Sequence, residues 1–253
     1  MEPVFRTLEI AVSLATKAIG TKITYQGLEN IPERGGAVIG INHTSYVDWW
    51  PAALAAYHRH RRMRFMIKTE MQDVKVVNFL IKHSGTIPVD RRAGGGAYAV
   101  AVERLKAGEI VGMYPEATIS RSFELKEFKS GAARMAHDAH VPIVPMIVWG
   151  AQRRWTKDHP RNMGRNKIPV AVAVGTPLDA ADTVDETSEA MRETMNALLH
   201  RVQEEYPHPE GAYWVPRRMG GSAPTMDEAR VLEERELAER ARRRAEREAK
   251  SRR

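Results

Sequence analysis

The chain has 253 residues, a formal net charge of +7, a sequence pI near 9.7, 43% apolar residues and no cysteine. The length fits one α/β domain with a short appendage or two small domains, and the lack of cysteine excludes disulfides, a thiolate nucleophile and cysteine-ligated metals. The basic charge favours anionic partners: nucleic acid, acidic membrane or phosphorylated small molecules. Because no apolar run reaches the roughly 18 residues of a membrane span and no signal-peptide pattern opens the chain, we expect a cytoplasmic protein or one that lies on a membrane surface.

The first predicted element is an amphipathic helix over residues 4–19. Apolar side chains recur there at spacings of three and four, and Gly20 is a typical end. Such a helix packs either on its own domain or on lipid.

Strands and helices then alternate along the chain. Strands are predicted over residues 22–26, 37–41, 64–68, 110–114, 141–148 and 170–174, and helices over 49–57, 74–83, 97–106, 129–140 and 187–206. This alternation predicts a single α/β domain with a mixed, mostly parallel central sheet flanked by helices. The prolines of the strand at 141–148 favour a sheet edge or a strand start.

The end of the chain differs in composition. A linker around residues 220–224 precedes a charged segment of Glu and Arg, which we interpret as a solvated helix that gives way to a disordered basic end over residues 240–253. The predicted organisation is an amphipathic helix over residues 1–20, a main domain over 21–218, and a linker with a partly helical or disordered tail over 219–253.

The most informative stretch is residues 39–50, where an apolar strand runs into His43 and Asp48 follows five positions later. A histidine at a strand end is well placed to accept a proton, and these two side chains meet only across a turn. An ordinary surface turn explains the same residues. Two further loops, 90–92 and 116–121, also follow predicted strands, and the carboxyl ends of strands in open α/β sheets gather ligands. One pocket would then hold a base, two arginines and a glutamate.

Four blocks of this sequence resemble the glycerolipid acyltransferases, the 1-acyl-glycerol-3-phosphate (lysophosphatidate) acyltransferase family. Residues 42–48 match the NHxxxxD box, and residues 85–91 are similar to the second block, which ends in an arginine. Residues 114–120 resemble the third block, usually FPEGTRS, and residues 141–145 the fourth, proline-bearing block. The resemblance covers about residues 20–180, and the four blocks occur in the family's order.

The resemblance implies transfer of a fatty acyl group from a thioester, acyl-CoA or acyl carrier protein, to a glycerolipid hydroxyl, with no other cofactor. It implies that His43 is the general base and that Asp48 orients and charges the imidazole. The substrate-binding residues that it implies are Asn42, Lys68, Arg91, Glu116, Thr118 and Ser120, and we add Arg92, which is next to Arg91, and Arg121 as further predicted substrate contacts.

The sequence departs from the family in the third block. Ala117 occupies the glycine position and Ile119 the arginine position, so the acceptor's phosphate loses its usual partner there. Arg91 keeps the arginine of the second block, and Arg121 is a candidate replacement cation. The predicted acceptor is lysophosphatidate; the alternative is another lysophospholipid or a glycolipid.

Other residues carry weaker signals. His137 and His140 have the spacing of a metal pair on a helix, but no third ligand is evident, and we expect no metal. The glycines at 94–96 precede a helix, where they either cradle a phosphate or form a flexible turn.

An enzyme with a lipid acceptor must reach a bilayer, so we expect a peripheral protein on the cytoplasmic side of the cell membrane that contacts anionic lipid. The predicted docking face comprises Phe5, Arg6, Leu8, Val12, Lys17, Trp49, Trp50 and the basic cluster at 59–64, with the basic tail adding attraction. Rival hypotheses are a basic nucleic-acid-binding protein, which lacks any reader motif, and a lipid-binding homologue without catalysis, which does not account for His43 and Asp48. We expect no nucleic-acid partner.

Overall fold

The structure, a computed structural model, describes residues 3–69, 84–89 and 95–251. The helix predicted over residues 74–83, as well as Arg91 and Arg92, lies outside the described residues. The chain divides into two compact units, one of residues 1–119 and 127–207 and the other of residues 120–126 and 208–253.

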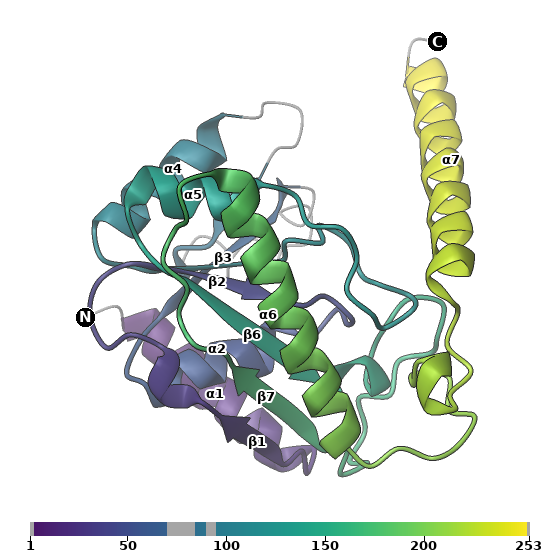
Figure 1. Cartoon of the computed structure of the whole chain (residues 1–253). Coiled ribbons are helices and arrows are strands. Elements are labelled where there is room, and N and C mark those ends of the chain that lie inside the picture. Colours follow the sequence, from purple (N-terminus) through teal and green to yellow (C-terminus); the bar gives the residue numbers. More distant parts are fainter. Residues whose placement is uncertain (1–2, 70–83, 90–94, 252–253) are drawn as a thin grey trace. The chain divides into compact units, whose positions relative to one another are not determined.

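The first unit is built on a mixed sheet that contains seven strands among the described residues (Figure 1). In chain order these are β1 (Ile23–Gln26), β2 (Ala37–Ile41), β3 (Met63–Lys68), β4 (Ile87–Val89), β5 (Ile110–Met113), β6 (Ile143–Trp149) and β7 (Val170–Val174). Their spatial order is β1-β7-β6-β2-β5-β3-β4, and every neighbouring pair is parallel except β6 and β7. The predicted fold class is therefore confirmed.

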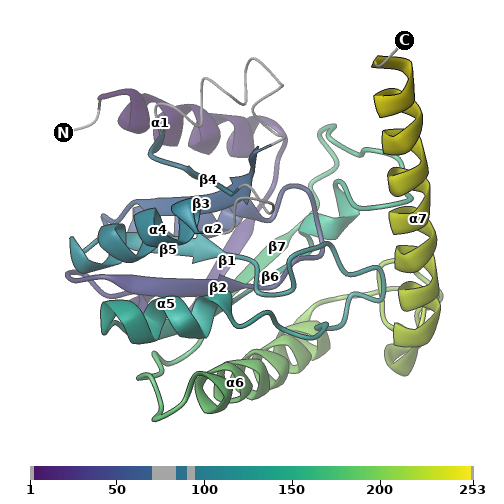
Figure 2. The same cartoon turned by 90° about the horizontal axis from the view of Figure 1, so that it is seen from above.

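Helices cover both faces of the sheet, as Figure 2 shows. On one face α4 (Gly96–Lys106), α5 (Gly131–Ala139) and α6 (Val184–Glu205) pack side by side; on the other lie α1 (Pro3–Ala18) and α2 (Trp49–His58). The start of α6 is set by a capping box, in which Thr183 and Glu186 each accept a hydrogen bond from the other's backbone amide.

β2 forms the middle of this core. All five of its residues are buried, because β6 and β5 flank it and helices cover both faces. A continuous apolar run without alternation is typical of such a strand. At Gly40, a Cβ would lie 3.0 Å from Met191 Sδ of α6, so glycine here lets the helix pack closely. β2 therefore provides a rigid base for the residues that follow it.

Of the two positions predicted for the proline-bearing strand, a sheet edge or a strand start, the edge is wrong, whereas Pro142 does directly precede the start of β6. β6 is an interior strand between β7 and β2, and all seven of its residues are buried. Pro145 is tolerated because its carbonyl accepts a hydrogen bond from Gly175, just beyond the end of β7. Its missing N–H therefore falls where the pairing with β7 stops.

α1 packs on α2 through one face. Thr16 accepts a 2.7 Å hydrogen bond from the buried indole of Trp50, and Val12 packs against the core. Val12 and Trp50 therefore do not belong to a docking face as predicted, because they form the inward contact of the helix pair. Among the α1 side chains that the structure describes, which do not include those of Phe5, Arg6 and Leu8, the large apolar ones that are exposed are Ile10 and Leu14, 47% and 60% exposed. Among the described residues, no helix has the length and apolar content to cross a membrane.

The basic cluster at 59–64 follows the far end of α2 from Trp49. Three of its arginines have partners inside the protein: Arg59 contacts Glu33, Arg61 donates to three backbone carbonyls, and Arg64 pairs with Glu109. α2 is about 15 Å long, so the cluster lies about that far from Trp49, and its part in a docking face stays a prediction.

The second unit contains the residues predicted as linker and tail. The segment around 220–224 is an ordered turn, with Ala223 buried and its amide donating to Val215. The helix α7 (Met226–Ser251) continues through the stretch predicted to be disordered. Ion pairs one turn apart, Arg240–Glu236, Arg242–Glu246 and Arg243–Glu239, favour helix in a segment with few apolar residues.

Candidate active site

Sheet register brings the first and third predicted loops together. Gly40 of β2 pairs with Met113 of the parallel strand β5, so three residues further on His43 and Glu116 lie opposite each other. The backbone amide of His43 donates a 2.7 Å hydrogen bond to Glu116 Oε1, whose side chain is buried. Glu116 therefore fixes the position of the histidine backbone.

Asn42 fastens the same loop to the strand on the other side. Its side-chain amide donates to the carbonyl of Val148 at 3.1 Å, and its carbonyl oxygen accepts from the amide of Val148 at 2.7 Å. The side chain thereby replaces the backbone ladder between β2 and β6 at the point where β2 ends. Asn42 is fully buried, so it has a structural role in the loop.

The turn after His43 presents Asp48 to the imidazole. Asp48 Oδ2 lies 3.2 Å from His43 Nδ1 and accepts hydrogen bonds from the amides of Thr44 at 2.8 Å and Ser45 at 2.7 Å. Burial raises the pKa of Asp48, while the contacts with His43, Ser45 and Thr44 act in the opposite direction. α2 begins at Trp49, and its positive end also favours the carboxylate.

This contact determines which histidine nitrogen can act. An ionised carboxylate only accepts hydrogen bonds, so Asp48 favours the tautomer with the proton on Nδ1. The lone pair is then on Nε2. The imidazole is 18% exposed, whereas the Asp48 side chain is fully buried. A partly exposed base that is oriented by a buried acid is suited to removing a proton from a bound hydroxyl.

A loop that sequence reasoning missed supports the turn from the opposite side. Ser45 Oγ lies within hydrogen-bond distance of the carbonyls of Ala151 and Trp155, and Thr156 donates to the carbonyl of Thr44 at 2.7 Å. These contacts span more than a hundred residues of sequence, and no local pattern marked them.

A buried arginine anchors that supporting loop. The guanidinium of Arg154 donates to the carbonyls of Gly164 and Asn162 and to the hydroxyl of Thr21. Its side chain is fully buried, so the guanidinium stabilises the loop through these hydrogen bonds and does not face solvent.

Tyr114 is a second residue that sequence reasoning did not single out. Its ring stacks on the imidazole of His43, with ring centroids 4.0 Å apart and 18° between the planes. The sequence did contain a signal for a role of Tyr114 at the site, because this residue directly precedes Pro115 and Glu116 in the third block.

The remaining predicted residues are placed as follows. Lys68 ends β3 at the same edge of the sheet, two strands from β2, which is about 10 Å. Thr118 is half-buried in the turn after Glu116. The second predicted loop follows β4, which ends at this edge, but Arg91 and Arg92 lie outside the described residues.

Ser120 and Arg121 belong to the second unit. Ser120 is buried and donates a 2.7 Å hydrogen bond to the carbonyl of Glu124, and Arg121 is ion-paired with Glu236 of α7 at 3.0 Å. In the first unit, Ile119 is buried. Ala117 adopts a left-handed φ of 61°, which explains why glycine suits this position.

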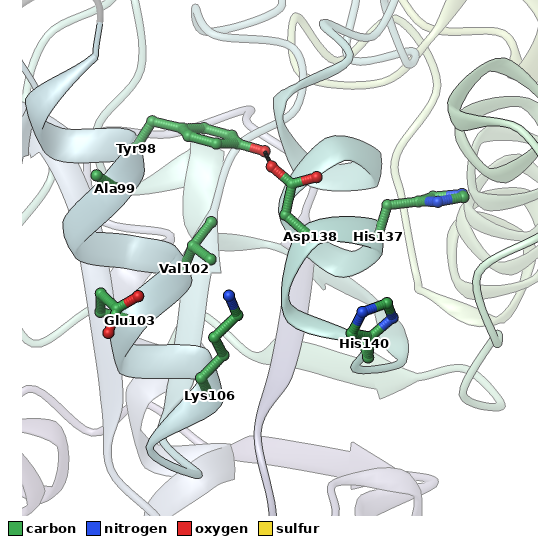
Figure 3. A pocket seen from close by; sticks show the side chains of 8 residues that line it. All are labelled: Tyr98, Ala99, Val102, Glu103, Lys106, His137, Asp138 and His140. Atoms are coloured by element: carbon green, nitrogen blue, oxygen red, sulfur yellow. Dashed lines mark hydrogen bonds between the residues drawn. The ribbon is translucent and has the colours of Figure 1, made fainter.

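A groove of about 520 Å³ lies elsewhere, between α4 and α5 (Figure 3). It is lined by Tyr98, Ala99, Val102, Glu103, Lys106, His137, Asp138 and His140. Tyr98 donates to Asp138, and His137 contacts Thr187, so these side chains serve helix packing. In the part of the chain that the structure describes, no group of three or more His, Cys, Asp or Glu side chains is arranged to hold a metal ion.

The fold and the His43–Asp48 pair define a class of α/β protein with a histidine–aspartate site at the carboxyl edge of its sheet. The same fold occurs in the 1-acyl-sn-glycerophosphate (LPA) acyltransferase PlsC from Thermotoga maritima, with a TM-score of 0.67 over 81% of this chain and 82% of that one, at 22% identity. Residues 22–149 match the Acyltransferase family.

This chain therefore belongs to the acyltransferase family, which confirms the resemblance drawn from the four blocks. It is 26% identical over 163 residues to a 1-acyl-sn-glycerol-3-phosphate acyltransferase of Borreliella burgdorferi, covering 63% of this chain and 64% of the relative. It is 29% identical over 180 residues to the protein of the same name from Bacillus subtilis, covering 70% and 84%.

Proposed function

We propose that this protein transfers a fatty acyl group from an acyl thioester, acyl-CoA or acyl carrier protein, to the free hydroxyl of lysophosphatidate. The observation that carries the proposal is the partly exposed imidazole of His43. Buried Asp48 contacts its Nδ1, and Glu116 accepts a hydrogen bond from the backbone amide of His43. The names of the relatives support the choice of acceptor.

The proposed reaction needs no acyl-enzyme intermediate. Nε2 of His43 takes the proton of the acceptor hydroxyl as its oxygen attacks the thioester carbonyl. The oxygen–carbon bond forms, the carbon–sulfur bond breaks, and the proton passes from the imidazolium to the departing thiolate. Asp48 stabilises the imidazolium between these two events.

A panel assay tests the proposal. Purified full-length protein is incubated with labelled acyl-CoA or acyl carrier protein and with lysophosphatidate, lysophosphatidylcholine, lysophosphatidylglycerol or a glycolipid. We expect the label in phosphatidate. Label in a different acceptor would replace lysophosphatidate by the alternative acceptor class, and hydrolysis without transfer, or no reaction, would contradict acyl transfer.

Ile119, at the arginine position of the third block, is apolar and buried, so it provides no charge for the acceptor's phosphate. We propose that Lys68, Arg91 and Arg92 contact it, with Arg121 as the replacement for the third-block arginine. Arg121 is ion-paired with Glu236, so any role in binding competes with that pair.

Paired substitutions separate the two roles of Arg121. Arg121→Gln and Glu236→Gln both remove the ion pair, but only Arg121→Gln removes a cation. If Arg121 binds the phosphate, KM for lysophosphatidate rises at least tenfold in Arg121→Gln, consistent with a charged hydrogen bond of about 1.5–3 kcal/mol, and falls in Glu236→Gln, because the competing ion pair is gone. Equal effects of both substitutions would assign Arg121 to the ion pair alone.

We also propose that the protein lies peripherally on the cytoplasmic face of the membrane, with α1 as the contact. Ile10 and Leu14 lie four residues apart on one face of the helix and are both exposed, and Lys17 is exposed one turn further on. Trp49 is 41% exposed at the start of α2, next to the His43 turn. Apolar and cationic side chains in this arrangement suit the headgroup region of anionic lipid.

Liposome flotation tests this contact. The double variant Ile10→Glu/Leu14→Glu should reduce the bound fraction on anionic vesicles at least tenfold, since each buried apolar side chain is worth about 1.5–3 kcal/mol. Val100→Glu is the matched control, because Val100 is 47% exposed on α4, and it should float like the original protein. Equal flotation of the double variant would refute the contact.

A further inference from the structure

The imidazole of His43 needs more than one contact to keep its orientation. Asp48 holds Nδ1 and Glu116 holds the backbone, but neither contact fixes the plane of the ring. The hydrogen bond restrains the distance between Nδ1 and Oδ2, but a coupled rotation about χ1 and χ2 of His43 can keep that distance and still move Nε2. A residue against the ring face is what prevents this rotation.

Tyr114 is the residue that lies against the ring face of His43. The rings are nearly parallel, at 18°, and their centroids are 4.0 Å apart, so the two side chains are in direct stacking contact. The position follows from the sheet, because Tyr114 comes directly after Met113, the β5 residue paired with Gly40. The Tyr114 side chain also packs against the hydrophobic core, which fixes its own orientation.

The stacking ring remains neutral. Burial, together with the negative charge of Asp48, raises the pKa of Tyr114 well above its ordinary value. Among the residues that the structure describes, the titratable groups in contact with the imidazole are Asp48 on its own turn and neutral Tyr114 directly after β5, while Glu116 contacts the backbone amide. A neutral aromatic face is also favourable for an imidazolium, because the ring quadrupole attracts a cation.

We propose that Tyr114 is a positioning residue for the proposed acyl transfer: its ring fixes the plane of the His43 imidazole, with Nε2 toward the acceptor, and stabilises the imidazolium formed when the base takes the proton. The inference rests on the proposed function. The ring carries the role, and the hydroxyl group has no hydrogen-bond partner among the residues that the structure describes.

Two variants of Tyr114 separate ring from hydroxyl. Tyr114→Phe keeps the stack and should keep kcat within about twofold. Tyr114→Leu keeps apolar bulk but loses the ring, and should lower kcat about ten- to a hundredfold with little change in KM, since aromatic pairing and small displacements of a reacting group have effects of this size. A fall confined to KM, or equal kcat in the two variants, would overturn the proposal.

The pH dependence of kcat adds a readout that a purely structural role would not move. Activity rises with pH as the base loses its proton, and without the ring the imidazolium is less favoured. The rising limb should therefore shift to lower pH in Tyr114→Leu and stay in place in Tyr114→Phe. An unchanged limb in Tyr114→Leu would contradict the contact with the imidazolium.

A measurement without substrate distinguishes failure of this inference from failure of the proposed function. In histidine-labelled protein, the His43 ring protons are identified by their absence from the spectrum of His43→Ala. Their resonances should lie upfield because of the Tyr114 ring current, remain so in Tyr114→Phe, and move downfield in Tyr114→Leu. Identical shifts in all three proteins would refute the stack, whatever reaction the protein catalyses.

Discussion

Replacing His43 with alanine is expected to lower acyl transfer by at least 10²- to 10⁴-fold, the contribution of a positioned general base. In the proposed reaction the thioester and the acceptor would still bind to the variant, but the base for the acceptor hydroxyl would be missing. KM for both substrates should change little, because in that reaction His43 contacts only the transferred proton of the acceptor. Single-turnover assays of the purified variant measure the loss directly.

The fold should survive this substitution. His43 is partly exposed and sits on a loop held by Asn42, Ser45 and Glu116, whose contacts do not use the imidazole. Thermal unfolding and vesicle flotation of His43→Ala should therefore match those of the original protein. Turnover that persists in a folded variant would eliminate His43 as the base.

Asp48→Asn is the second substitution with a large expected effect. Asparagine retains an oxygen for the amides of Thr44 and Ser45, but its NH₂ group is a donor and no longer favours a proton on Nδ1 of His43. The imidazole is left in the wrong tautomer and its cation without a counter-charge. We expect kcat to fall about 10²- to 10⁴-fold, measured with lysophosphatidate at saturation.

The same variant should be no less stable at neutral pH. Burial raises the pKa of Asp48 in the folded protein, so the stability associated with its neutral form is complete below the unfolded pKa and is lost as the pH rises through the folded pKa. Asparagine removes this loss. Denaturant unfolding at acid and neutral pH should show stability falling across that interval in the original protein relative to Asp48→Asn, and the opposite trend would contradict the burial cost.

Much of this architecture could be predicted from the sequence because it depends on local patterns. The apolar run at 37–41 and the alternation of strands and helices placed β2, the His43 loop and the sheet correctly. The contact of His43 with Asp48 follows from the turn between them, and the contact of their loop with Glu116 follows from the parallel pairing of β2 with β5. The role of Asn42 toward β6 required the register, which the sequence does not specify.

The parts that could not be predicted depend on distant contacts. The support of Ser45 by the loop at 151–156 joins residues far apart in the chain, and periodicity carries no information about it. Pro145 suggested an edge strand because proline lacks a donor, yet the donor is dispensable where β7 ends. Arg121 resembled a substrate residue in sequence, whereas the structure pairs it with Glu236, a residue of a helix whose composition suggested partial disorder.

The two hydrogen bonds between Asn42 and Val148 have a consequence for when the site forms during folding. Asn42 contacts a residue 106 positions away, and His43 contacts Glu116 across 73 positions. Contacts of such separation form only after long loops have closed, later than helices and local turns. A nascent or partly folded chain therefore holds the histidine without its orientation. The arrangement of Asn42, His43 and Glu116 is therefore complete only when the three central strands β6, β2 and β5 have joined.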